Sequence, residues 1–317
     1  MNKRIAIGIA VMAMAVTVAQ AAVDGVALVP GGLWSATATW ANGIIPGSVV
    51  ATNIVSIPLG STVTLNSSVP LNVNRIQVGQ GSAGAGTGTL TINSGASVTS
   101  TNSINVGMNR IGSFYMTGGN VTNLGNFNVA CNGGGGTGSA AISGGVMTNK
   151  AITIGGNTNG TLSVTGGQLL GTTLTLGNAV SNLFSGAVTL TGGSIELSTD
   201  ANGLVINSGN SASKLTIGNT GELIWNGSHV ADIATMLTAS KIDWSSGSST
   251  LGLTYGLGDR TWTNGIYFLH ADYNNDVTTG NDLKTRVWAD TIPEPATIGM
   301  IGLGALITLL IRRMRIY

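Results

Sequence analysis

The chain has very few charged side chains, and this scarcity limits what it can do. Only 8% of its 317 residues are Asp, Glu, Lys or Arg, about a third of the usual share. No Asp or Glu occurs between Gly25 and Ile195. Glycoside hydrolysis normally needs two carboxylates, and acid–base chemistry on sugars needs positioned titratable groups. We therefore expect no enzyme activity from this long stretch.

Cysteine and histidine are almost absent as well. Cys131 is the only cysteine, so no disulfide can form within the chain, and we interpret it as a small core residue. His229 and His270 are 41 residues apart, without H-E-x-x-H spacing or a cysteine cluster. The sequence therefore predicts no zinc site and no cofactor, and we expect both histidines at the surface or in a terminal cap.

Strong helix formers are also scarce, whereas the 49 glycines are about twice the usual share. The abundant Thr, Ser, Asn and Val residues favour strands and tight turns over an α/β or all-helical fold. An apolar content of 43% is enough to form a core and argues against disorder.

The N-terminus has the pattern of a secretory signal peptide. Two basic residues precede an apolar run over residues 5–19, and Ala19 and Ala21 form an Ala-x-Ala cleavage site. The run is too short and wrongly flanked for a membrane-spanning helix. We expect signal peptidase to act here, so that the mature chain begins at Ala22, outside the cytoplasm.

A second apolar run, residues 296–311, lies near the C-terminus. The residues that frame it are Pro293, Glu294 and Pro295 before it and Arg312, Arg313 and Arg315 after it. A helix of this length rises about 24 Å, slightly less than a hydrocarbon core of about 30 Å. Because arginines snorkel and stay on the cytoplasmic side, the pattern predicts a short transmembrane helix that anchors an exported protein at the inner membrane.

This C-terminus resembles the PEP-CTERM sorting signal over about the last 25 residues. The resemblance implies that an exosortase, a membrane cysteine protease, cuts near the Pro-Glu-Pro and passes the protein to the cell surface or extracellular matrix. It also implies that the prolines and Glu294 are the recognition element and that the arginines set the topology. A plain C-terminal anchor is the alternative.

Removal of both ends would leave eight basic and eleven acidic residues. Such a chain lacks the positively charged stripe that nucleic acid requires, so we expect no nucleic-acid partner. Three basic residues, Arg75, Arg110 and Lys150, remain in the acid-free stretch, and we interpret them as isolated residues that serve solubility.

A repeat fills the middle of the chain. Its first element is a pair of apolar residues, one position apart, before a glycine turn; it recurs at steps of 24, 26, 22 and 26 residues, a range typical of repeat proteins. These pairs are Leu90 and Ile92, Phe114 and Met116, Ala140 and Ile142, Leu162 and Val164, and Val188 and Leu190. A second element, about half a repeat later, comprises Ile104 and Val106, Phe127 and Val129, Ile152 and Ile154, Leu174 and Leu176, and Leu204 and Ile206. We therefore expect two short strands in each repeat.

Alternation with period two indicates strands, because a helix would need apolar residues three and four apart. Stacked repeats enclose a continuous core that one repeat cannot form alone. The sequence therefore predicts an all-β fold, a right-handed parallel β-helix with glycine pairs at its corners. A β-sandwich of hairpins is the structural alternative. The units over about residues 60–225 resemble the strand repeats of bacterial autotransporter passengers, which implies a surface β-helix and no particular activity.

The ends of such a rod need caps. We assign Trp34 and Trp40, in a Trp-rich segment that resembles the opening of bacterial surface β-helices, to covering the first coil; an aromatic sugar-binding platform is the alternative. Apolar residues at helical spacing over 230–237 predict a short closing helix, with Ser228 as its cap. The expected domains are a signal peptide (1–21), an N-terminal cap (22–60), β-helix repeats (61–225), a C-terminal cap (226–290) and the sorting signal (293–316).

Two segments resemble ligand-binding motifs but depart from the patterns that those motifs require. Residues 79–84 spell G-x-G-x-x-G, but neither a helix nor an acidic residue follows at the required distance, so we expect no nucleotide. Asp272, Asn274 and Asp276 resemble the start of a calcium loop, yet the sixth-position glycine is missing and Asp282 comes one place early. We favour a turn stabilised by Asx side chains and keep calcium as an alternative.

These observations predict a structural or adhesive protein of the cell surface or extracellular matrix, with exopolysaccharide as a candidate partner. Two alternatives from other classes remain: a carbohydrate-active β-helix enzyme with its site between Glu196 and Asp290, and a carbohydrate-binding module.

Overall fold

The structure is a computed structural model that describes residues 24–47, 52–68, 71–81, 86–131, 136–178, 183–244, 260–263, 267–274 and 283–291. The predicted signal peptide and sorting signal, with the expected transmembrane helix, lie outside these residues. Within the ranges given, no helix is long and apolar enough to cross a lipid bilayer.

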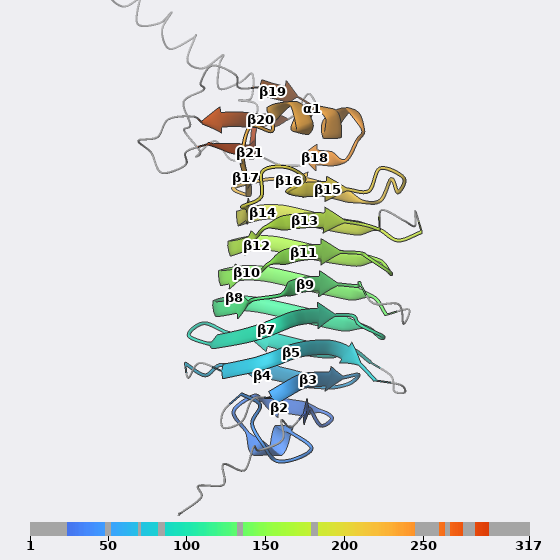
Figure 1. Ribbon diagram of the computed structural model, residues 1–317, viewed down its shortest axis with the longest axis vertical. Coiled ribbons are helices and arrows are strands. Elements are labelled where there is room, and N and C mark those ends of the chain that lie inside the picture. The colour runs from blue at the N-terminus through green and yellow to red at the C-terminus, as the bar shows by residue number, and fades with distance from the viewer. Residues whose placement is uncertain are drawn as a thin grey trace, which may run out of the picture.

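The described chain is built almost entirely of strands, which stack as the rungs of one rod (Figure 1). The strands up to the middle of the chain are β1 (Gly25–Val26), β2 (Gly31–Leu33), β3 (Thr52–Pro58), β4 (Thr62–Leu65), β5 (Leu71–Gln80), β6 (Gly88–Ile92), β7 (Ser97–Val106), β8 (Gly112–Asn123), β9 (Asn126–Val129), β10 (Gly138–Thr148) and β11 (Ala151–Ile154). Those that follow are β12 (Gly160–Gly171), β13 (Thr173–Leu176), β14 (Gly186–Leu197), β15 (Leu204–Ile206), β16 (Lys214–Ile217), β17 (Glu222–Asn226), β18 (Ile242–Trp244), β19 (Arg260–Thr263), β20 (Tyr267–Asn274) and β21 (Lys284–Thr291). The helices are η1 (Thr37–Thr39) and α1 (Val230–Thr238).

These strands form a β-solenoid of about 8 turns whose turns have three faces. On the first face, β2, β4, β6, β8, β10, β12, β14, β16 and β18 pair in that order, always in parallel. On the third face, β1, β3, β5, β7, β9, β11, β13 and β15 do the same. The second face lies between them and contains the N-terminal halves of β5 and β7, the C-terminal halves of β8, β10, β12 and β14, and then β17. This parallel order confirms the predicted β-helix and rules out the hairpin-linked sandwich for the described repeats.

Each repeat has two strands, as expected, but the first strand is longer than expected because it does not end at the glycine pair. β12, for example, runs through Gly166 and Gly167 and pairs with β14 on both sides of the bend. Beyond the bend only Leu169 is fully buried before the strand reaches Gly171. One inward residue gives too short a pattern to indicate a separate strand.

Glycine is required at this corner for two reasons. Gly119, Gly145, Gly167 and Gly193 have φ angles of 77°, 79°, 72° and 65°, a region that side chains with a Cβ rarely adopt. In addition, a Cβ on Gly145 would lie 2.3 Å from the carbonyl oxygen of Gly119 in the neighbouring turn. The close stacking of turns therefore excludes any side chain here.

The core consists of straight rows of inward apolar residues, as the alternation predicted. On the first face the row contains Leu90, Phe114, Ala140, Leu162, Val188, Leu215 and Ile242, each at most 5% exposed. Phe114 meets Phe127 of the third face edge to face, with ring centroids 5.5 Å apart. Burial of apolar surface contributes about 25 cal/mol per Å², so this continuous core holds the turns together.

The N-terminal end is closed by two tryptophans, as expected. Trp34 and Trp40 are 0% and 1% exposed, and their rings meet edge to face at 5.2 Å. The Trp34 indole donates a hydrogen bond to the Pro46 carbonyl, and the Trp40 indole donates to the Trp34 carbonyl. Because both rings are buried, they do not form an exposed sugar-binding platform.

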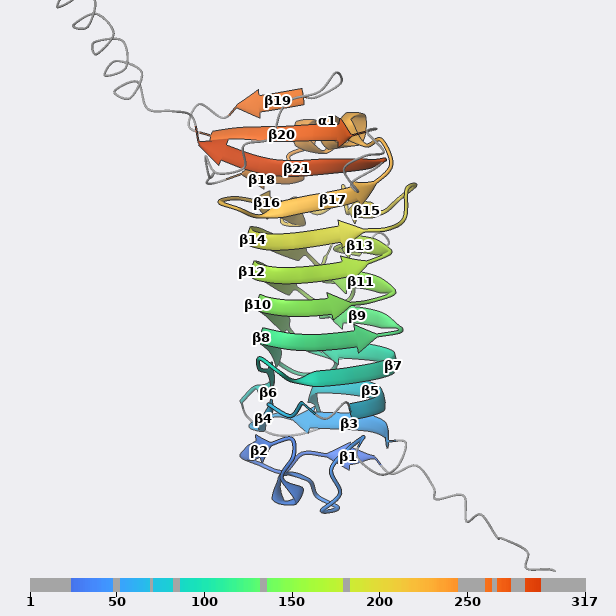
Figure 2. The same ribbon diagram turned by 90° about the vertical axis from the view of Figure 1, so that its left-hand side faces the viewer.

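At the C-terminal end the parallel order stops, and α1 and three antiparallel strands cover the last turns (Figure 2). Strand β21 pairs antiparallel with β17, and β20 and β19 continue outward in antiparallel pairs. The predicted helix is present, but it begins one residue later than expected: its N-cap is His229 and not Ser228. The backbone N–H of His229 donates to Oγ1 of Thr285 on β21, so a tertiary contact fixes the start of the helix.

Candidate functional site

The residues predicted to direct export lie outside the described part of the chain. These are Ala19 and Ala21 of the signal-peptidase site and Pro293, Glu294, Pro295, Arg312, Arg313 and Arg315 of the sorting signal. Their roles stay predictions from the sequence.

Asp272, the first residue of the calcium-like motif, lies within strand β20. It stands directly opposite Arg286 on β21 in the antiparallel ladder. A calcium loop would place this residue in a turn, where several oxygens converge on the ion. Asp276 and Asp282 are outside the described residues. Within the described ranges, no group of three or more His, Cys, Asp or Glu side chains is arranged to hold a metal ion.

The first carboxylates after the acid-free stretch are engaged in ion pairs with the C-terminal cap. Glu196 on β14 pairs with Lys284, and Glu222 on β17 pairs with Arg286. The side chains of the second pair are only 13% and 19% exposed. These pairs attach β21 to the second face, so the carboxylates serve the junction between solenoid and cap.

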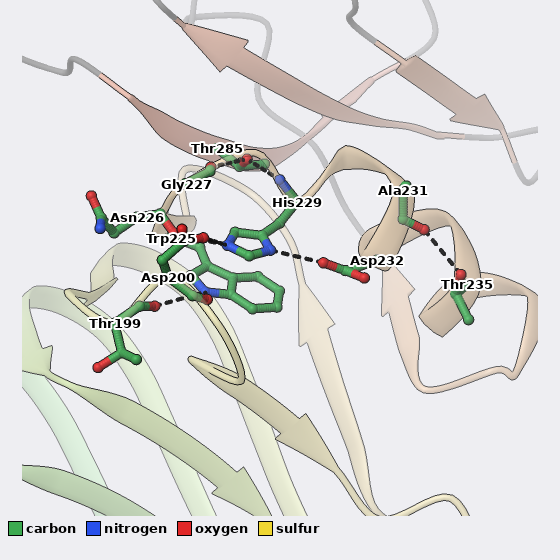
Figure 3. A network of polar contacts seen from close by, with 10 residues as sticks. All are labelled: Thr199, Asp200, Trp225, Asn226, Gly227, His229, Ala231, Asp232, Thr235 and Thr285. Carbon is green, nitrogen blue, oxygen red and sulfur yellow. Dashed lines mark hydrogen bonds and ion pairs between the residues drawn. The ribbon is translucent and has the colours of Figure 1, made fainter.

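A network of polar contacts surrounds His229 at this same junction (Figure 3). Its Nδ1 lies 2.8 Å from Oδ2 of Asp232, and its Nε2 lies 2.8 Å from the Asn226 carbonyl and 3.0 Å from Oδ1 of Asp200. The imidazole stacks on the indole of Trp225. Both ring nitrogens thus face oxygen acceptors from the protein itself.

A pocket of about 410 Å³ lies beside this cluster and is lined by Asp200, Trp225, His229 and Asp232 among others. The two aspartate side chains are 69% and 57% exposed, so their attraction to the imidazole is weakened by water. A general base needs a ring nitrogen that faces the substrate, whereas both nitrogens of His229 face protein oxygens. The arrangement is therefore suited to joining β17 to α1.

Sequence reasoning missed the role of His229, although it placed the residue in the cap. The only signal was its position immediately before a short helix and four residues after a tryptophan. The partners Asp200 and Thr285 are far away in the sequence: parallel stacking of β17 on β14 brings Asp200 close, and the antiparallel return of β21 brings Thr285.

Cys131 lies at the corner after β9 and is partly exposed, not in the core as expected. Its thiol donates to the carbonyl oxygens of Val129 and Thr153, at 3.3 and 3.2 Å. Burial raises the pKa of the thiol to about 11. Since the thiolate is the reactive form, Cys131 is poorly suited to act as a nucleophile.

One comparison with known proteins gives a match. Residues 291–315 match the family model of the PEP-CTERM protein-sorting motif, which agrees with the resemblance of the C-terminus. No curated protein and no solved structure matches the chain. The motif implies that the chain is exported and sorted to the cell surface by an exosortase. The likeness of the repeats to autotransporter passengers stays a prediction.

Proposed function

We propose that the mature chain is a structural or adhesive rod of the cell surface or extracellular matrix, without catalytic activity of its own. Its sorting motif gives the destination, and its solenoid gives a rigid body of about 8 turns. We also propose a transient anchor at the inner membrane before release to the surface.

The outward rows of the solenoid carry this proposal. On the first face one such row contains Thr89, Ser139, Thr161 and Ala187, with Ser113 at the same register but buried, and the next row contains Thr91, Tyr115, Ala141, Ser163 and Thr189. These side chains are small or polar and uncharged, and parallel pairing repeats them at about 4.8 Å along the rod. Such a surface can contact a polymer or a neighbouring rod over a long distance through many weak contacts.

The ion pairs at the cap support a role without catalysis. The enzyme alternative places its site between Glu196 and Asp290, yet Glu196 and Glu222 are paired with Lys284 and Arg286. A glycosidase acid–base pair must instead face the sugar.

The adhesive role is tested in the producing cells. Deletion of the gene should weaken cell-to-cell cohesion or retention of the matrix, and the wild-type gene should restore it. Unchanged cohesion in the deletion strain would overturn the adhesive role.

Mass spectrometry of the secreted protein should give a C-terminus close to Pro293, and an intact tail would overturn exosortase cleavage.

The absence of catalysis is tested with the purified mature chain. Incubation with a panel of acidic and neutral glycans should release neither reducing ends nor unsaturated products. Release of either product would instead establish the carbohydrate-active enzyme.

A further inference from the structure

A polar groove of about 590 Å³ opens on the third face, beside its corner with the second face. Four successive turns contribute to it, through Arg75 on β5, Ser103 and Asn105 on β7, Asn126 and Asn128 on β9, and Lys150 just before β11. The backbone register places Arg75 opposite Ser103 and Ser103 opposite Asn126. The groove therefore follows the rod axis over three strand spacings, about 14 Å.

The groove is positively charged, and nothing nearby compensates the charge. Arg75 and Lys150 both line it, no acidic residue does, and the chain has no acid between Gly25 and Ile195. The interpretation of these two cations as isolated was therefore wrong. They are 75 residues apart in the sequence, which is about three repeats, so the stacking of turns brings them to one groove.

Arg75, which lines the groove, carries a buried donor without a partner. The Nε atom of Arg75 is buried and makes no hydrogen bond in the described structure. A buried donor without an acceptor is costly, and a guanidinium readily binds carboxylate oxygens through several N–H groups. Because Arg75 is partly exposed and lines the groove, a ligand carboxylate can pair with its guanidinium.

The floor between the two cations is neutral and held in place. Nδ2 of Asn128 donates to Oδ1 of Asn105 at 2.8 Å, and Nδ2 of Asn105 donates to Oγ of Ser103 at 3.3 Å. These bonds orient the amide groups before any ligand arrives, which reduces the entropy lost on binding. Amides and hydroxyls in fixed positions are suitable partners for sugar hydroxyl groups.

We propose that this groove binds an acidic polysaccharide whose sugars carry carboxylates. Arg75 and Lys150 pair with carboxylates on separate sugars of one chain, and Ser103, Asn105 and Asn128 bind the hydroxyls between them. A small anion would reach only one of the two cations, whereas a linear polymer can follow the groove along the rod. A nucleic acid is disfavoured because the lining residues contain no aromatic side chain on which bases could stack. The inference rests on the proposed surface function and names its partner.

The binding test uses the purified mature chain, titrated calorimetrically with polygalacturonate and, as a neutral polymer, dextran. The wild type should bind polygalacturonate, more weakly at high salt, and should not bind dextran. Arg75→Gln combined with Lys150→Gln should lower the affinity at least about tenfold, because each lost charge-assisted contact is a large share of weak binding. The control, Arg110→Gln, removes one positive charge, as Arg75→Gln or Lys150→Gln alone does, from the acid-free stretch but outside the groove, and should change the affinity less than about twofold.

Folding is checked by circular dichroism and thermal melting, and Lys150→Gln alone provides a variant at an exposed corner position. Absence of polygalacturonate binding by the wild type would overturn the proposal, as would equal losses in the groove and control variants. Equal binding of DNA would also overturn it, since that outcome indicates unspecific attraction of polyanions.

The outcome can be separated from that of the proposed function. If cells that carry the double variant cohere as well as the wild type, while deletion of the gene abolishes cohesion, the groove proposal fails and the adhesive role stands. If the purified chain binds polygalacturonate through the groove but deletion leaves cohesion unchanged, the groove stands and the adhesive role fails.

Discussion

The imidazole of His229 lies flat against the indole of Trp225, with ring centroids 3.7 Å apart and planes inclined by 8°. Trp225 belongs to β17, the last strand of the second face before the cap, and its Nε1 donates to the carbonyl oxygens of Thr199 and Asp200. His229 is the N-cap residue of α1. The stacked rings therefore join the solenoid directly to the element that covers it.

Replacement of His229 by alanine should destabilise this joint. The substitution removes the ring stack and leaves the Asn226 carbonyl without its partner, while the 7% exposed side chain leaves a cavity. We expect a loss of about 2–4 kcal/mol in the free energy of unfolding, measured by urea denaturation. Asp232→Asn, which keeps an acceptor at a 57% exposed position, is the control and should cost less than about 1 kcal/mol. Equal stability of wild type and His229→Ala would show that the joint is unimportant.

The glycine corners offer a pair of substitutions with the same backbone angle. Gly145 and Gly95 both have φ of 79°, but a Cβ on Gly145 would lie 2.3 Å from the Gly119 carbonyl oxygen, whereas a Cβ on Gly95 would meet nothing within 4 Å. Gly95→Ala should therefore cost only the left-handed conformation, about 1–2 kcal/mol. Gly145→Ala should cost about 1–3 kcal/mol more than Gly95→Ala, because neighbouring turns must move apart. Similar melting temperatures for the two variants would contradict the role of close stacking.

The ion pair between Glu222 and Arg286 should contribute more than an exposed pair. Glu222→Gln leaves a guanidinium that is only 19% exposed without its counter-charge, so we expect a loss of about 2–4 kcal/mol. Lys214 and Asp243 form a pair with side chains 35% and 53% exposed, and Asp243→Asn should cost less than about 1 kcal/mol. Urea unfolding of both variants, at low and high salt, measures the difference. A larger loss of unfolding free energy for Asp243→Asn than for Glu222→Gln would contradict the stabilising role of the pair between Glu222 and Arg286.

The raised pKa of the Cys131 thiol predicts that the stability of the chain depends on pH in the alkaline range. Its pKa is raised from 9.0 to about 11 in the folded chain, so between these values the unfolded chain loses the thiol proton and the folded chain keeps it. The stabilisation of the folded chain by the protonated thiol is fully present below pH 9. It is lost as the pH rises toward 11, by at most about 1.4 kcal/mol per pH unit. Melting temperatures of wild type and Cys131→Ser should therefore converge or cross over this window. Parallel curves for the two proteins would show that the thiol does not titrate differently on unfolding.

The solenoid could be predicted because its signals are local. The alternation of Leu162 and Val164 with Ser163 and Thr165 gives the inward face of a strand, and the spacing of such pairs gives the stacking. The second face could not be predicted, since residues such as Leu169 are single inward positions beyond a glycine pair. Periodicity needs at least two positions to be visible.

The junction and the groove depend on contacts between residues far apart in the sequence. Nothing near Glu222 indicates that Arg286 returns antiparallel beside it. The groove was more accessible to sequence reasoning than it first appears, because Arg75 and Lys150 differ by about three repeats and must therefore lie at nearby positions three turns apart. Sequence separations counted in repeats thus predict which charged residues lie close together, and composition alone does not.

The three corners of the solenoid differ in how they accept extra residues. Between β8 and β14 every passage from first to second face uses the same Gly-Gly bend, while the passages from third to first face comprise residues 130–137, 155–159 and 177–185 and so differ in length. Between β8 and β14, the longer passages therefore lie along a single edge of the rod. A short foreign epitope placed on that edge would be displayed at the cell exterior without disturbing the ladders, which makes the molecule a natural scaffold for presenting peptides.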